Sequence, residues 1–313
     1  MRQRTRAKGR KVNGILLCDK PLGVSSNAAL QSAKNLYYAQ KVGHTGSLDP
    51  LASGMLPLCF GEATKISQFL LDSNKYYRVV IKLGEKTASG DAEGEVIERW
   101  PVPEISDSLL EKVLNDFTGE IQQVPPMYSA LKQKGQPLYK LARQGIEVER
   151  EARTLNILSL ELLKFEGNSL ELDVYCSKGT YVRTLAEDIS AALGCGGGHI
   201  TCLRRLKVGP FDGNMYSLET LKEIKESGDF EALDELLLPI DHGVSQWPML
   251  NLLPATVLQL RQGQPVFIPN SPTTGLIRLY TEDNSFLGLG EMQDDGKIAS
   301  RRLFRACSES ITG

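Results

Sequence analysis

The chain of 313 residues is 41% hydrophobic and 24% charged, and its formal net charge is −2. This composition is typical of a soluble globular protein, and no apolar run reaches the roughly 20 residues that a transmembrane helix needs. We therefore expect a cytoplasmic protein with one large hydrophobic core, or with a large core and a small appended domain.

The hydrophobic periodicity and the turn residues predict a series of elements. In residues 76–84, for example, Tyr77 and Val79 alternate with Arg78, as in a half-buried strand. In chain order, the predictions are a strand at 12–21, a helix capped by Ser25 or Ser26 that ends near residue 38, a short apolar segment at 55–60, a helix at 63–71, a strand at 76–84, helices at 107–118 and 136–145, a hairpin of 154–165 with 169–179, and a helix at 180–194.

Helices and strands alternate irregularly, and several strands are joined by hairpin-like turns. This order favours an α+β fold with a mixed, largely antiparallel central sheet flanked by helices, instead of a doubly wound parallel sheet. Near residue 248 the helical pattern stops and prolines become frequent. The remaining residues, 248–313, contain short alternating strands separated by glycine, which predicts a small C-terminal β-barrel domain.

Charge is unevenly distributed along the chain. Residues 1–12 form a basic arm with six basic side chains and no acidic one, and residues 128–153 hold six basic and three acidic side chains. Residues 214–241, in contrast, hold eight acidic side chains and two lysines. Basic clusters on a nearly neutral protein are compatible with binding of a polyanion, although such runs are also typical of ordinary solvated surfaces.

Several common catalytic motifs are missing from the sequence. It has no GxxxxGK[ST], HExxH or GxSxG motif, and no GxGxxG after a strand, so nucleotide-dependent and serine-hydrolase activities lose support. Cys195, His199 and Cys202, with Cys176 as a fourth ligand, are candidates for a zinc site. There is no CxxC pair, however, and the six cysteines are sparse and compatible with small, reduced, buried residues.

The segment GHTGSLDPLASG, residues 43–54, contains a single carboxylate, Asp49, between Leu48 and Pro50. The proline disfavours a helical backbone at Asp49, and the leucines indicate that the loop packs inward. A carboxylate in a semi-apolar pocket needs a cation, and Arg183 is a candidate partner that would keep Asp49 ionised and suited to act as a nucleophile. The alternative is a simple turn in which Asp49 accepts hydrogen bonds from its own backbone.

Aromatic side chains next to basic residues are what stacking on an unpaired RNA base requires. Taken alone, each of the aromatic or histidine side chains favours a place in the core, as a core aromatic or a hydrogen-bonded histidine. Together they indicate an RNA-binding protein; the set comprises Tyr77, Tyr181 and His44 with Lys20, Lys132 and Arg183.

The sequence resembles the bacterial TruB-type tRNA pseudouridine-55 synthases. The resemblance rests on GHTGSLDPLASGMLPLCFGEATK, DKPLGVSS, YYRVVIKLG, PPMYSALKQKGQPLYKLARQGIEVER, CSKGTYVRTLAEDI and LRRLKVG, which agree with the family in order and spacing over residues 12–210. It implies a pseudouridine synthase catalytic domain at 1–247 and a PUA-like RNA-binding domain at 248–313. It also implies isomerisation of one uridine in the T-loop of the T-arm stem-loop of tRNA, without cofactor or metal, by a protein that we expect to be a monomer.

The resemblance also implies roles for individual residues. Asp49 would be the catalytic aspartate, Arg183 its partner, and Tyr77 the residue that stacks on the flipped-out uracil. The substrate-binding residues would be His44, which supports the flipped-out nucleotides, Tyr181 and Leu203, which line the uracil pocket, Lys20, which belongs with Pro21 to the family's first motif, and Lys132, which lies in a basic stretch near the RNA.

The sequence departs from the family pattern at Ala88, where an acidic residue is frequent, although Asp91 in the same loop matches. The small-for-small change at Ser47 has no expected consequence. Two other classes of function stay open. One is an RNA-binding or RNA-folding protein without catalysis, and the other is a metal-dependent hydrolase that uses His44, Asp49 and the cysteine cluster.

Overall fold

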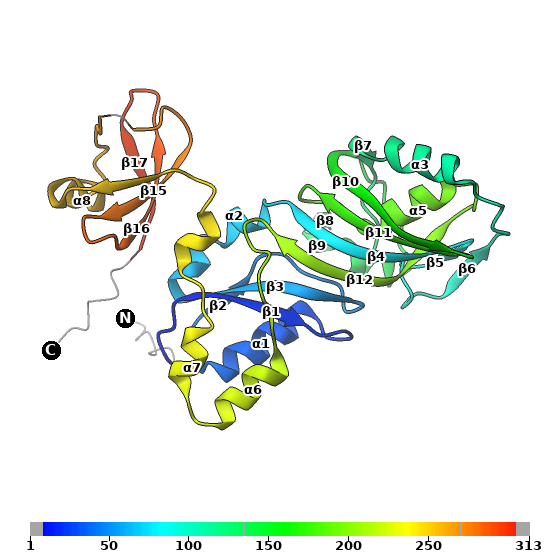
Figure 1. The fold of residues 1–313 in the computed structure, drawn as a ribbon, viewed down its shortest axis with the longest axis horizontal. Helices are drawn as coiled ribbons and strands as arrows, with labels where there is room; N and C mark the ends of the chain where they lie inside the picture. Colours follow the sequence, from blue (N-terminus) through cyan, green and yellow to red (C-terminus); the bar gives the residue numbers. More distant parts are fainter. Residues whose placement is uncertain (1–8, 130, 134, 270, 305–313) are drawn as a thin grey trace.

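The structure is a computed structural model that describes residues 9–304 except 130, 134 and 270. Most of the predicted basic arm, residues 1–8, lies outside the described residues. Figure 1 shows a long twisted sheet with helices packed on it, and a separate small sheet joined to it by the segment after α7 (Phe230–Glu235). The predicted combination of a central sheet with a separate C-terminal sheet domain is therefore confirmed.

The central sheet is mixed and largely antiparallel, as predicted. Its strands follow the order β13-β1-β3-β12-β4-β11-β10-β7, with β2 paired to β3. Among the described strands of this sheet, the β1–β13 and β3–β12 pairs are parallel and the other pairs are antiparallel. The strands are β1 (Gly14–Lys20), β2 (Val42–His44), β3 (Ala52–Phe60), β4 (Lys75–Leu83), β7 (Gly119–Gln123), β10 (Arg153–Glu166), β11 (Ser169–Cys176), β12 (Gly198–Val208) and β13 (Tyr216–Ser217).

The helices pack on the sheet in two groups. Helices α3 and α5 cover β4, β11 and β12 through one hydrophobic cluster, and α1, α6 and α7 cover β1 and β3 through another. Short two-stranded sheets occupy the loops, β5 (Glu85–Thr87) with β6 (Val96–Arg99) and β8 (Lys132–Gln133) with β9 (Gln136–Pro137). The helices of this part are α1 (Ser26–Leu36), α2 (Ser67–Leu71), α3 (Asp107–Asp116), α4 (Leu138–Ala142), α5 (Val182–Ala192) and α6 (Leu218–Glu226), with α7 as above.

Two predicted helices are shorter than expected. The segment 63–71 begins as a 3-10 helix, Gly61–Lys65, and becomes α-helical only after Ile66, whose side chain is fully buried. The segment 136–145 is helical only in α4, because Pro137 before it is extended and Gly145 after it has a φ of 72°. In contrast, α1 begins at the predicted cap, where the Ser25 hydroxyl accepts a hydrogen bond from the Ala28 amide.

The C-terminal sheet has the order β14-β15-β16-β17 and its own hydrophobic cluster, to which α8 (Pro254–Arg261) contributes. Its strands are β14 (Met249–Leu252), β15 (Leu276–Thr281), β16 (Phe286–Met292) and β17 (Ile298–Leu303). Leu289 and Phe304 pack with Ile66 and Leu70, so apolar contacts connect this sheet to the segment around α2. The boundary at residue 248 stays a prediction.

Gly54 in β3 allows a close contact that any other residue would prevent. Its φ is 98°, and a Cβ atom there would lie 2.3 Å from the backbone oxygen of Arg205 in the paired strand β12. We expect Gly54→Ala to lower the free energy of unfolding by about 3 kcal/mol, from combined backbone strain and overpacking, as measured by urea unfolding. Gly213→Ala is the matched control, since a Cβ atom there would meet no atom within 4 Å. Equal stability of the two variants would contradict this account.

Candidate active site

A cavity of about 1000 Å³ lies at the N-terminal end of α5. The segments around it include the loop between β2 and β3, the loop after β5, the segment 128–143, the turn that leads into α5, and the inward face of β4 and β12. Its lining includes Asp49, Tyr77, Tyr181, Arg183 and Leu203. The structure therefore brings together five of the eight residues for which the sequence predicted a role.

The Arg183 guanidinium lies between two loops, each of which contributes one carboxylate. Its Nη2 lies 3.1 Å from Oδ2 of Asp49 and its Nη1 lies 3.7 Å from Oδ2 of Asp91. Nη1 also donates to the carbonyl of Ser89 at 2.8 Å, and Nη2 to that of Tyr128 at 2.6 Å. The arginine side chain is 9% exposed and that of Asp49 is 49% exposed, so the charge of Asp49 is compensated from the protein side while the carboxylate faces the cavity.

The loop that carries Asp49 is held from behind by Lys20, which is fully buried. Its Nζ donates to the carbonyls of Pro21 and Val24 at 2.8 and 2.6 Å, and to that of Pro50 at 3.4 Å. Burial lowers the pKa of this ammonium group, and the nearby charge of Asp49 partly opposes that effect. Lys20 has no exposed surface in this structure, and its hydrogen bonds position the loop that carries Asp49. Its substrate-binding role stays a prediction.

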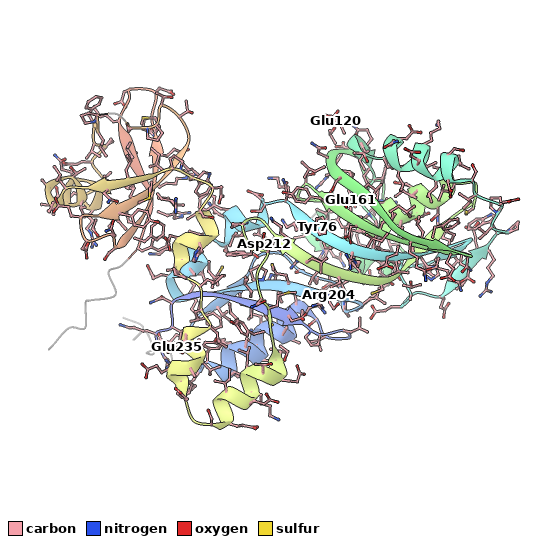
Figure 2. All side chains as sticks on the ribbon, in the orientation of Figure 1. Tyr76, Glu120, Glu161, Arg204, Asp212 and Glu235 are labelled. Atoms are coloured by element: carbon pink, nitrogen blue, oxygen red, sulfur yellow. The ribbon has the colours of Figure 1, made fainter. Side chains whose placement is uncertain are left out.

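Tyr77 lies in the wall of the cavity on β4, opposite Arg205 of β12. Burial raises the pKa of the Tyr77 hydroxyl, so the group stays protonated at neutral pH. Arg205 is 1% exposed and donates to the carbonyls of Met55 at 2.7 Å and Gly46 at 3.1 Å. Sequence reasoning assigned no role to Arg205. The sequence feature that could have identified Arg205 is strand alternation. It turns Arg205 inward, while its neighbour Arg204, labelled in Figure 2, points toward Asp19 on the opposite face.

Besides Lys20, two more of the predicted residues, His44 and Lys132, are not among those that line the cavity. His44 is half-buried on β2, and burial and then the charge of Arg205 lower the pKa of its imidazole. Its Nδ1 is buried and has no hydrogen-bond partner within the described part of the chain. Lys132 is exposed on β8, in the hairpin with β9. RNA-binding roles for both residues stay predictions.

Comparison with known proteins covers almost the whole chain. Residues 34–182 match the family model for the TruB family pseudouridylate synthase N-terminal domain, and residues 183–245 match that for the tRNA pseudouridylate synthase B C-terminal domain. A tRNA pseudouridine synthase B of Stutzerimonas stutzeri is 54% identical over 298 residues, which are 95% of this chain and 97% of the relative. The protein with that name from Ectopseudomonas mendocina is 55% identical over 94% and 96% of the two chains. The chain belongs to the TruB family.

The rest of this TruB family chain is also matched. Residues 248–304 fit a model described as pseudouridine synthase II TruB, C-terminal. A solved Cbf5-Nop10-Gar1 complex contains a chain that is 25% identical, with a TM-score of 0.71 over 93% of this chain and 84% of that one. A structure of an H/ACA RNP bound to a substrate RNA shows the same fold at 22% identity and a TM-score of 0.71, over 97% and 92% of the two chains.

The alternative metal site is not assembled in this TruB family chain. Among the described residues, no group of three or more His, Cys, Asp or Glu side chains is placed to hold a metal ion. Cys195 is buried and Cys202 is exposed, while His199 Nδ1 lies 3.0 Å from the carbonyl oxygen of Glu85. The same ranges, 9–304 without the three gaps, contain no helix that is both long and apolar enough to cross a membrane.

Proposed function

We propose that this chain isomerises uridine-55 in the T-loop of tRNA to pseudouridine, and that Asp49 is the reacting carboxylate. The observation that carries the proposal is the ion pair of Asp49 with Arg183 at the edge of a cavity that also presents Tyr77. The choice of tRNA rests on relatives that are at least 50% identical and carry the name tRNA pseudouridine synthase B. The choice of position 55 and of the T-arm rests on the motif resemblance.

The reaction breaks the bond between ribose C1′ and uracil N1 and forms a bond between C1′ and C5. The proton on C5 is lost, and N1 gains a proton, so the reaction needs no redox partner. A carboxylate can assist by attack on C1′, by addition to the uracil ring, or by removal of a ribose proton. Asp49 suits each route because Arg183 compensates its charge without covering it.

The cavity suits a reaction in which a freed base must be kept in place. Leu48 and Leu203 are buried apolar residues in its wall, and they limit the water that competes for reactive intermediates. Removal of the target nucleotide from the stacked loop costs roughly a few kcal/mol. Stacking on Tyr77 and basic contacts to the phosphates would offset this cost.

The remaining assignments belong to the same proposal. His44 and Lys132 contact the folded T-arm outside the cavity, and Tyr181 and Leu203 contact the uracil. Residues 1–247 form the catalytic domain and residues 248–313 a PUA-like RNA-binding domain. The protein acts as a monomer in the cytoplasm, without metal or cofactor.

The test uses tRNA labelled with tritium at C5 of uridine. We expect the purified protein to release one equivalent of label per tRNA without an added cofactor and with chelator present, because the C5 proton is lost only when the new bond forms. A tRNA with cytidine at position 55 should release no label. Tight tRNA binding without any release would instead support an RNA-binding or RNA-folding protein without catalysis. Stoichiometric zinc by elemental analysis, with activity lost to chelator, would support the metal-dependent hydrolase class.

A further inference from the structure

Two buried cations in the cavity wall have no acidic partner among the described residues. Lys75 and Arg205 are 7% and 1% exposed, and both line the cavity. Neither has a carboxylate oxygen within 4 Å in the part of the chain that the structure describes, in contrast to Arg183. A buried charge without a counter-charge is costly, so an anion at this place would be strongly favoured.

Lys75 is partly satisfied by the backbone. Its Nζ donates to the carbonyls of Leu71 at 2.7 Å and Ser73 at 2.5 Å. An ammonium group has three N–H donors, so one donor is left for a ligand in the cavity. These two bonds fix the head group, which lowers the entropy that binding would cost.

The charges around Lys75 do not replace the missing partner. Arg205 on β12 repels its charge, and Cys176 on β11 is a buried thiol whose pKa burial raises to about 11, so it is neutral at pH 7. Asp72, whose charge raises the pKa of Lys75, forms a 2.8 Å ion pair with Lys178 at the surface. Burial, followed by repulsion from Arg205, lowers the pKa of Lys75 to about 8.

We infer that Lys75 and Arg205 form a subsite for a phosphodiester group of the RNA, next to the nucleotide whose base enters the cavity. The inference rests on the proposed function, because it takes RNA as the ligand. Lys75 precedes Tyr77 by two residues on one face of β4, which places their Cα atoms about 7 Å apart. Tyr77 is proposed to stack on the base. Lys75 and Arg205 lie beside it, where they would contact the phosphate of the same nucleotide or of the next one.

The experiment measures binding of a T-arm stem-loop RNA at several salt concentrations, in the Asp49→Asn background so that no product forms. Lys75→Gln removes the charge but keeps two N–H donors for the carbonyls of Leu71 and Ser73. We expect it to weaken binding about fivefold to tenfold at low salt and to reduce the slope of log K against log salt by about 0.7 to 1. Lys222→Gln, which removes an equal charge from the surface of α6, should leave both quantities unchanged.

A pH series separates the charge of Lys75 from its packing. The charged form binds phosphate, so affinity should be greatest below the pKa of about 8 and should fall about fivefold between pH 7 and pH 9. Lys75→Arg keeps its charge throughout this range and should remove the dependence, and Lys75→Gln should also be flat but weaker. Urea unfolding of both variants reports any loss of fold separately.

Three outcomes would overturn the inference: an unchanged salt slope in a folded Lys75→Gln variant, an equal pH dependence in Lys75→Arg, or a loss of label release by Lys75→Gln with Asp49 intact while the RNA affinity is unchanged. The last result would place Lys75 at the base instead of the phosphate. Label release by the unmodified protein, measured separately, reports on the proposed function. If Lys75→Gln weakened RNA binding as expected but the unmodified protein released no label, the proposed function would be refuted and the phosphate subsite would still stand.

Discussion

Asp49→Asn should abolish the release of tritium from C5, with a fall of at least about 10³-fold in single-turnover rate. The amide has nearly the same shape as the carboxylate, so the loop that Lys20 supports should keep its conformation. It has no negative charge, however, and cannot attack C1′, add to the uracil ring, or accept a ribose proton. The affinity for tRNA should stay within a few-fold, because one half-exposed side chain contributes little to contacts spread over a folded arm.

The matched control for this variant is Asp173→Asn. Asp173 also pairs with an arginine, Arg78, through two 2.8 Å hydrogen bonds, but it does not line the cavity. We expect its variant to release label at a rate within a few-fold of the unmodified protein. Substantial turnover by Asp49→Asn, or an equal loss in both variants, would show that Asp49 is not the reacting group.

The sequence was informative where local chemistry decides the structure. The cap at Ser25, the hairpin of β10 with β11, and the inward side chain of Tyr77 all follow from spacing and alternation. The motifs also predicted that Asp49 and Arg183 form a pair, although 134 residues separate them (183 − 49). The structure places their charged groups in contact. The resemblance of both motifs to the family supported that pairing, because spacing along the chain alone could not show that the two loops meet.

Other features depend on tertiary contacts that no local pattern encodes. Lys20 looks like a surface residue in the sequence, but the carbonyls of three separate residues surround its ammonium group. Asp91 matched the family motif, yet its proximity to Arg183 depends on how the loop after β5 folds over the start of α5. The break in the helix predicted at 63–71 follows from the burial of Ile66 against the sheet.

Arg183→Met should be the variant that most disturbs the cavity, because one guanidinium serves two carboxylates and two carbonyls. Asp91 is 5% exposed and would be left as a buried charge without a cation. Breaking such a pair costs about 3–5 kcal/mol, which urea unfolding should reveal. Label release should fall by about 10³-fold, since Asp49 also loses the guanidinium that pairs with its charge and orients it.

The double variant Arg183→Met with Asp91→Asn separates stability from catalysis. Neutralising Asp91 removes the buried charge, while its Oδ1 can still accept from Ser89 and from the Glu93 amide. We therefore expect the double variant to recover most of the lost stability, as removal of both partners of a buried pair is far less costly than removal of one. Label release should not recover, because Asp49 still lacks its partner. If release returned along with stability, Arg183 would act only by holding the loop after β5 in place, and the ion pair with Asp49 would have no part in the reaction.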